Sequence, residues 1–214
     1  MVAHEYAHGY AALKQGDDTA YKLGRLTWNP IKHIDLRMTI IMPIFLWWAS
    51  GYTFTFGGAK PIPVVPSQFT NYRRGDIIVS LAGIAANCAL AIIGTLLVIA
   101  FGLAGRAAPA ASDSLALLQY MFGLGVMINV MLAWFNLMPI PPLDGSHVMK
   151  HLLPASWAVH YERFAKFGII LLIVMLWLPW ARRALDIWMW PAVQVIKGAL
   201  RVASPFMLPS PWTI

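Results

Sequence analysis

The sequence predicts an all-α polytopic membrane protein, a bundle of about 4–6 transmembrane helices with one re-entrant segment that resembles a β-hairpin. Of its 214 residues, 59% are hydrophobic and only 12% are charged, whereas a soluble domain carries roughly 25% charged residues. Lipid must therefore replace much of the usual solvated surface. Three uncharged apolar runs reach the length of about 20 residues that a helix needs to cross a bilayer.

The charge pattern and the cysteine content exclude several function classes. The net charge is +7, but the lysines and arginines are spread between apolar runs rather than clustered in one stripe, so the sequence indicates no nucleic-acid partner. Cys88 is the one cysteine in the chain. This excludes an intramolecular disulfide, a zinc ribbon and a redox cysteine pair.

The first expected element is a helix over residues 1–14. It contains His4, Glu5 and His8 in the pattern H-E-x-x-H. Two histidines at i and i+4 lie on one helix face, where their imidazoles can bind a single zinc ion, and the glutamate between them is placed to act on a zinc-bound water. The alternative is a helix with two polar surface histidines, which the membrane context disfavours.

The second element, residues 38–66, is expected to enter the membrane and return to the same side. Pro43 and Gly51 interrupt its apolar run, and Thr53 to Phe56 alternate as a strand does. If the segment re-enters, the loops place eleven lysines and arginines on one face and three on the other, as the positive-inside rule favours; a full span leaves almost no bias. Irregular backbone at that depth implies a cavity or a protein contact.

Two full spans are expected next, at residues 77–105 and 115–142, neither of which contains a charge. The apolar run 167–181 is shorter, but flanking cations can reach both interfaces and let it cross. The sequence from residue 187 onward contains Pro191 and two cations. For this last part of the sequence, an interfacial helix and a further transmembrane span are therefore equally good interpretations.

A catalytic zinc ion needs a third protein ligand and an open position for water. Among the acidic residues, Asp76 and Asp144 stand at ends of apolar runs, where an ionisable group is a functional candidate. Asp144-Gly145 after prolines is, however, also ordinary turn chemistry. A rival metal face joins Asp144 to His147 and His151 at helical spacing. No glutamate lies between these histidines, and we expect them to support a site or lie at the interface.

The chain resembles the site-2 protease family of intramembrane zinc metalloproteases, peptidase family M50, in its small bacterial branch without a PDZ domain. The resemblance rests on His4-Glu5-Tyr6-Ala7-His8 and on the distant Asn136, Pro139 and Leu143-Asp144-Gly145. It covers residues 1–155, which we expect to form the catalytic membrane core. Residues 156–214 are expected to form C-terminal transmembrane or interfacial helices.

The resemblance implies one zinc ion per chain and three kinds of site residue: zinc ligands, a general base, and residues that position the substrate. These carry over, in that order, to His4, His8 and Asp144, to Glu5, and to Asn136 and Pro139. One departure is that only three residues precede the first zinc ligand, so that it falls where helices fray. We expect from this that the natural chain starts further upstream.

The implied function is a zinc-dependent intramembrane endopeptidase, which hydrolyses peptide bonds within or near transmembrane segments in regulated intramembrane proteolysis. Its substrates would be single-span membrane proteins, and the enzyme would be a multi-pass protein of the cell (inner) membrane with its active site toward the cytoplasmic side. Two alternatives stay open. A pseudoprotease would bind membrane helices without cutting them, and a metal transporter would need a polar path that the two long spans lack.

Overall fold

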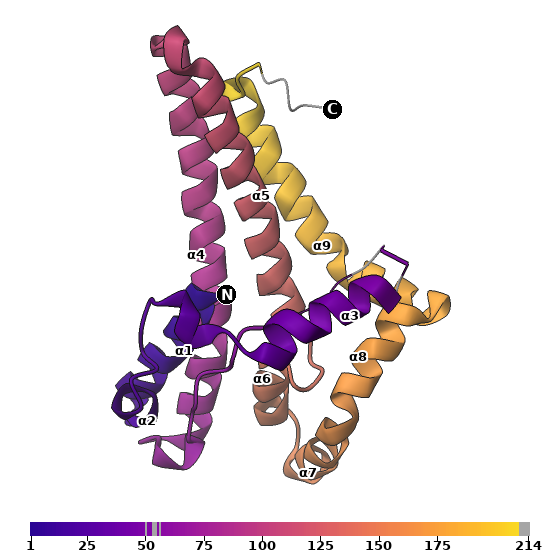
Figure 1. The fold of residues 1–214 in the computed structure, drawn as a ribbon. Helices are drawn as coiled ribbons and strands as arrows, with labels where there is room; N and C mark the ends of the chain where they lie inside the picture. The colour runs from indigo at the N-terminus through magenta and orange to yellow at the C-terminus, as the bar shows by residue number, and fades with distance from the viewer. Residues whose placement is uncertain (50, 53–54, 56, 210–214) are drawn as a thin grey trace. The chain divides into compact units, whose positions relative to one another are not determined.

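Helices make up the regular structure of this protein, and no strand occurs within the residues that the computed structural model describes, 1–49, 51–52, 55 and 57–209 (Figure 1). The predicted all-α class is therefore confirmed for this part of the chain. The α-helices are α1 (Val2–Gln15), α2 (Thr19–Lys22), α3 (Met42–Ala49), α4 (Tyr72–Ala107), α5 (Ser112–Asn136), α6 (Asp144–Leu152), α7 (Ala155–Phe164), α8 (Gly168–Trp177) and α9 (Pro179–Ala203).

Short helices of other types connect the α-helices. A π-helix covers Leu36–Ile41, and 3₁₀ helices cover Pro30–His33, Pro66–Gln68, Pro109–Ala111, Ala165–Phe167 and Ser204–Phe206. The chain divides into two compact units, Met1–Ala86 and Asn87–Ile214, and each is described by itself. The predicted boundary at residue 155 between a catalytic core and C-terminal helices stays a prediction.

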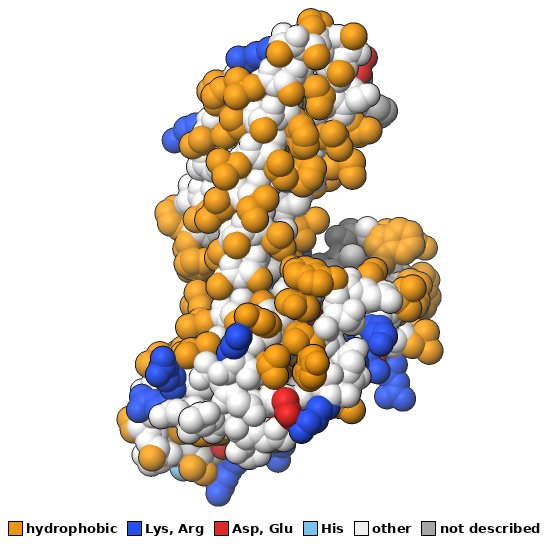
Figure 2. All heavy atoms as spheres, turned by 90° about the vertical axis from the view of Figure 1, so that its left-hand side faces the viewer, with side chains coloured by type: hydrophobic (Ala, Val, Ile, Leu, Met, Phe, Trp, Pro, Cys, Tyr) orange, Lys and Arg blue, Asp and Glu red, His pale blue; other side chains and the backbone are white. Residues whose placement is uncertain are grey.

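Two helices in the described residues are long and apolar enough to cross a membrane, Tyr72–Ala107 and Pro109–Asn136. Large apolar side chains on α4, such as Ile92 and Leu96, are more than 60% exposed, and Figure 2 shows hydrophobic side chains along the long helices. Lipid contact is the ordinary explanation for such a surface on a long apolar helix. The higher count of 4–6 spans stays a prediction, because α8 has only 10 residues, about 15 Å of helix.

The first predicted span, 77–105, lies inside α4. Arg73 and Arg74 precede it and Arg106 follows it, so that cations flank the apolar stretch at both ends, where their side chains can reach polar surroundings. The second span was predicted to run to residue 142, but α5 ends at Asn136. Three prolines, at 139, 141 and 142, follow this end; proline lacks the N–H of the helical ladder, so the helix cannot continue through them.

The segment predicted to re-enter the membrane begins as a helix and not as a strand. The π-helix and α3 occupy it up to residue 49. Of the residues predicted to alternate as a strand, Thr53 to Phe56, residues 53, 54 and 56 lie outside the described residues. Two hydrogen bonds join the far part of this segment to its first residues. The N–H of Gly58 donates to the carbonyl of Met38 at 2.9 Å, and the Thr39 hydroxyl donates to the carbonyl of Gly58 at 2.7 Å.

In the first unit, α1 ends at Gln15, and Gly16 caps it with a φ of 109°, the left-handed conformation of a helix C-cap. The N–H groups of Gly16 and Asp17 close this cap on the carbonyls of Leu13 and Ala12. A buried hydrophobic cluster in this unit consists of Ala12, Phe69 and Val79. Packing of these side chains joins α1 to the start of α4, and it places the α1 histidines beside α4.

In the second unit, buried polar side chains connect apolar helices. Gln119 is 1% exposed; its amide nitrogen donates to the carbonyls of Val98 at 2.7 Å and Phe206 at 3.0 Å, and its oxygen accepts from the N–H of Leu208 at 3.0 Å. Its amide is thus satisfied on both sides, as burial requires. The indole N–H groups of Trp134 and Trp188 likewise donate to each other's carbonyls, which joins α5 to α9.

Candidate metal centre

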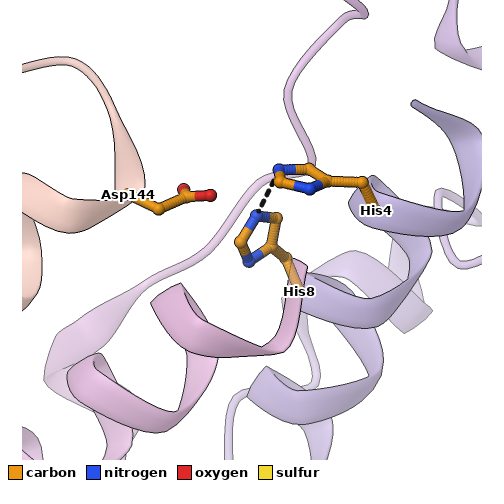
Figure 3. Close-up of side chains that lie close together, drawn as sticks. All are labelled: His4, His8 and Asp144. Carbon is orange, nitrogen blue, oxygen red and sulfur yellow. Dashed lines mark hydrogen bonds between the residues drawn. The ribbon is translucent and has the colours of Figure 1, made fainter. Parts of the chain in front are cut away.

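Two buried imidazoles on α1 point toward each other. His4 and His8 are each 8% exposed, their Nε2 atoms are 3.0 Å apart, and their rings are nearly perpendicular at 88°. Figure 3 shows this contact as a dashed line. The predicted i, i+4 arrangement on one helix face is thus present, with both Nε2 atoms directed to the same place.

The tautomer of His8 follows from its other ring nitrogen. Nδ1 of His8 lies 2.7 Å from the carbonyl oxygen of Val79 on α4. Because a carbonyl oxygen can only accept, this nitrogen carries the proton, and the lone pair of the neutral ring is on Nε2. A hydrogen bond from the far nitrogen to a carbonyl is also how proteins orient histidines that ligate metals.

The two histidines fit a zinc ion. Two Zn–N bonds of about 2.0–2.1 Å at a tetrahedral angle place the nitrogens about 3.4 Å apart, close to the 3.0 Å between the two Nε2 atoms. Imidazole is a preferred zinc ligand, and burial keeps competing water away from the nitrogens. The geometry of His4 and His8 therefore fits two of the ligand positions of a catalytic zinc site, and their role as zinc ligands stays a prediction.

Gly83 on α4 provides the room for these rings. A Cβ at this position would lie 2.4 Å from Nε2 of His8 and 2.6 Å from Cε1 of His4. Real Cβ atoms do not approach other atoms this closely, so any side chain at residue 83 must displace the imidazoles. No pattern in the sequence indicated that Gly83 packs against the two histidines.

We expect Gly83→Ala to lower zinc affinity by about 10–100-fold, the range seen when groups that orient metal ligands are lost. Metal analysis of the purified protein after dialysis against buffered zinc measures this change. Gly123→Ala is the matched control, because a Cβ at residue 123 on α5 meets nothing within 4 Å. Equal zinc content in the two variants would contradict the role assigned to Gly83.

Glu5, the predicted base, is half-buried on α1 next to His4. Its Oε2 accepts a hydrogen bond of 2.8 Å from the backbone N–H of Ile62. The carboxylate is thus held by a segment 57 residues further along the chain, a contact that no sequence pattern indicated.

Asp144, predicted as the third ligand, is the first residue of α6 in the second unit and is half-buried (Figure 3). Here Asp144-Gly145 starts a helix rather than forming an isolated turn. A Cβ at residue 145 would lie 2.1 Å from the carbonyl oxygen of Leu137, so glycine is required for α6 to pack on the end of α5. The carboxylate also lies where the helix dipole favours negative charge.

The two predicted substrate-positioning residues also lie in the second unit. Asn136 is the last residue of α5, and its side-chain amide donates to the carbonyl of Leu132 at 2.9 Å. The carbonyl of Pro139 accepts a hydrogen bond of 3.0 Å from the hydroxyl of Tyr161 on α7. These contacts fix the loop between α5 and α6. The roles of both residues toward a substrate stay predictions.

The rival metal face is not assembled. His147 is exposed on α6, and among the described residues His147 and His151 belong to no group of three candidate metal ligands. The two histidines at i and i+4 that are buried together are those of α1.

Asp17 is a buried carboxylate that the sequence analysis did not select. It is 1% exposed and accepts hydrogen bonds from the N–H groups of Thr19 at 3.0 Å and Val65 at 2.6 Å. Burial by itself raises the pKa of Asp17, but hydrogen bonds from the Thr19 side chain and from the N–H groups of Val65 and Thr19 outweigh it and hold the pKa below its usual value. The signal in the sequence was the pair Gly16-Asp17 directly after the predicted zinc helix, a stretch that also resembles the site-2 protease family.

Comparison with known proteins connects this geometry to a family. The family model of peptidase family M50 matches residues 102–179, which include Asn136, Pro139 and Asp144. "Putative zinc metalloprotease YwhC" of Bacillus subtilis is 38% identical over 94% of this chain and 84% of its own length. "Putative zinc metalloprotease Rip2" of Mycolicibacterium smegmatis is 30% identical over 90% of this chain and 68% of its own length.

A third relative is archaeal. "Putative zinc metalloprotease MJ0611" of Methanocaldococcus jannaschii is 34% identical over 74% of this chain and 69% of its own length. No solved structure matched the chain.

Proposed function

This chain belongs to peptidase family M50, the site-2 protease family, and we propose that it hydrolyses peptide bonds within or near the transmembrane segments of membrane proteins. As a member of this family it is a metalloprotease with zinc as its cofactor. The observation that carries the proposal is the buried histidine pair on α1, with the His8 ring oriented by Val79 and with Glu5 beside it.

We assign zinc binding to His4, His8 and Asp144. The two imidazole nitrogens of the first unit fit the ion, and a carboxylate completes the His₂-carboxylate donor set that some catalytic zinc sites use. The resemblance supports Asp144 as the donor, and so does the family match over residues 102–179. Asp144 closes an uncharged apolar run, and an ionisable group in such a place is a candidate for a functional role.

Glu5 is the proposed general base. Zinc, when bound, polarises the substrate carbonyl and makes water more acidic. Glu5 takes the proton from the attacking water and passes it to the leaving amine, which is the usual double role of one carboxylate in acid–base catalysis. The N–H of Ile62 holds Oε2, so Oε1 is the oxygen that exchanges the proton. A carboxylate fixed in this way needs no reorientation during the reaction.

The two long apolar helices support action inside a membrane. A helical substrate hides its scissile carbonyl in its own hydrogen bonds, so it must unwind before attack. The segment from Thr53 to Val65 is proposed to receive the unwound substrate as an added strand. Its residues 57–65 have no regular secondary structure. Asn136 and Pro139 are proposed to position the unwound substrate, and the re-entrant course of residues 38–66 is proposed to bring it to membrane depth.

We propose a multi-pass location in the cell (inner) membrane, with the active site toward the cytoplasm. The loops with eleven lysines and arginines support this orientation, because such loops stay on the cytoplasmic side. The proposed partners are single-span membrane proteins and the surrounding lipid.

Removal and return of zinc test the enzymatic part of the proposal. The purified protein in detergent is incubated with a tagged single-span substrate before and after treatment with a strong chelator, and again after zinc is added back. We expect cleavage to be lost with the metal and restored with it. Cleavage that persists in the fully metal-free protein would contradict the proposal.

Cys88 tests the membrane location. It is exposed on α4, near the middle of the uncharged stretch. In sealed vesicles of either orientation, we expect a charged maleimide to leave Cys88 unlabelled until the membrane is dissolved in SDS, because a charged reagent does not enter the hydrocarbon core.

The control for this experiment is Tyr21→Cys in a Cys88→Ser background, because Tyr21 lies on α2 and is 65% exposed. We expect its thiol to react only in vesicles that expose the cytoplasmic face. If Cys88 reacts as fast as this control in intact vesicles, α4 does not cross the membrane.

A further inference from the structure

We propose that residues 60–66, here called the strap, position the carboxylate of Glu5, and that Asp17 is the residue that fastens the strap. This inference rests on the proposed function, because it concerns the base of the proposed reaction. It assigns a task to Asp17, a buried acid that takes no part in zinc binding or proton transfer.

The strap contacts Glu5 through a single backbone donor. The N–H of Ile62 donates to Oε2 of Glu5 at 2.8 Å. Pro61 and Pro63 flank Ile62 and have no N–H, so Ile62 carries the one amide hydrogen of these three residues. The sequence Pro-Ile-Pro thus presents one backbone donor, which Glu5 accepts, while the guanidinium of Arg25 donates to the carbonyls of Lys60 at 3.2 Å and Pro61 at 3.4 Å.

Packing holds this donor against α1. The Ile62 side chain is 7% exposed and lies over Gly9, where a Cβ would come within 2.4 Å of Ile62 Cδ1. Gly9 follows Glu5 by four residues, so it lies on the same face of α1, one turn away. The glycine allows the strap to lie directly on the helix beside the base.

Asp17 fastens the strap beyond the end of α1. Its Oδ2 accepts the N–H of Val65 at 2.6 Å, and its Oδ1 accepts the N–H of Thr19 at 3.0 Å. A short hydrogen bond to a buried carboxylate is stronger than one between neutral groups. On the other side of Ile62, the N–H of Lys60 donates to the carbonyl of His33 at 2.8 Å. The strap is therefore fixed on both sides of the residue that contacts Glu5.

The function of this arrangement is to restrict the carboxylate of Glu5 to one orientation. A glutamate on a helix surface has three rotatable bonds, and ordering them during the reaction slows proton transfer. The strap orders the Glu5 side chain before the substrate binds, because the N–H of Ile62 holds its Oε2 atom. Asp17 touches neither substrate nor metal in this scheme; it is a positioning residue that acts through Val65 and Ile62.

Asp17→Ala is the first test variant, and Asp18→Ala is its matched control, because the Asp18 side chain is 42% exposed and pairs with Lys22 at 2.8 Å. For cleavage of a tagged single-span substrate, we expect Asp17→Ala to lower kcat by about 10–100-fold, the effect of a misplaced catalytic group. We expect KM to change by less than about 3-fold and zinc content to stay the same. Asp18→Ala should match the wild type.

Ile62→Pro is the second test variant, because it removes the donor itself. We expect Ile62→Pro to lower kcat in the same way as Asp17→Ala. The conservative variant Ile62→Val keeps the N–H and most of the packing, so its kcat should equal that of the wild type. Higher kcat in Ile62→Pro would overturn the proposal, because the strap would then restrain the base rather than position it.

Hydrogen exchange gives a readout that needs neither zinc nor activity. Between residues 61 and 65 only Ile62, Val64 and Val65 have backbone amide hydrogens, so exchange of this peptide in the metal-free protein reports the strap directly. We expect faster exchange in Asp17→Ala and in Glu5→Ala, and wild-type exchange in Asp18→Ala.

The outcomes separate this inference from the proposed function. If the wild-type protein cuts no membrane substrate, the proposed function fails, but hydrogen exchange still decides whether Asp17 fastens the strap. If the wild type is active and Asp17→Ala keeps its kcat or loses zinc, Asp17 does not position Glu5. Unchanged exchange in Asp17→Ala would overturn the inference in either case.

Discussion

His8→Ala and Asp144→Ala are each expected to lose both bound zinc and peptide cleavage. Each variant removes one of three proposed ligands, and the remaining two cannot form the site that a catalytic zinc ion requires. The expected loss of activity is at least about 10³-fold, because without the metal neither the water nor the carbonyl is activated. Metal analysis and a cleavage assay on the same purified samples measure both effects.

The chain offers matched controls for this pair. His160 is an exposed histidine on α7 whose Nδ1 lies 2.7 Å from the carbonyl of Ser156, and Asp113 lies in the first turn of α5 as Asp144 does in α6. Alanine at either position should leave zinc binding and cleavage unchanged. If Asp144→Ala keeps a full zinc ion while His8→Ala loses it, the third ligand is not Asp144.

Glu5→Gln is expected to abolish cleavage while the protein keeps its zinc. The amide oxygen of glutamine can still accept the hydrogen bond from Ile62, so the strap should stay in place, but the amide cannot take a proton from water. Loss of a general base lowers the rate by about 10²–10⁴-fold. Zinc content, measured alongside kcat, separates this loss from a loss of the metal.

Glu162 provides the control, because it is the one other glutamate of the chain. It lies on α7 and pairs with Lys150 at 3.5 Å, and Glu162→Gln should keep full activity. If Glu5→Gln works as well as the wild type in a membrane-helix binding assay and neither protein cuts, the chain is a pseudoprotease. That result would contradict the mechanism proposed for Glu5.

The parts of the fold that depend on local pattern were predictable. The apolar run of α4 and the H-E-x-x-H spacing of α1 both follow from helical geometry, and both are present. The predicted end of the second span at residue 142 was wrong, because the uncharged run continues past the helix, whereas the prolines at 139, 141 and 142 lack the N–H groups that a helix needs. Residues 38–49 were read as part of a strand-like hairpin, but they are helical.

Of the candidate site, only the zinc-ligand and base side chains were predictable from the sequence. His4, Glu5 and His8 are recognisable by spacing, whereas the groups that orient them come from distant segments. The carbonyl of Val79, the missing side chain of Gly83 and the N–H of Ile62 are backbone features, which carry no chemical signature in a sequence. Asp17 was missed for a related reason: an acid after a helix looks like a solvated residue until its burial is known.

The most direct test of the central claim is to reconstitute the protein in lipid vesicles with a tagged single-span substrate and to map the cut bond by mass spectrometry. We expect a cut within or near the transmembrane segment, made by zinc-loaded wild-type protein and absent with zinc-loaded Glu5→Gln. Zinc-loaded wild-type protein that leaves every single-span substrate intact, or cuts only soluble proteins, would contradict the central claim.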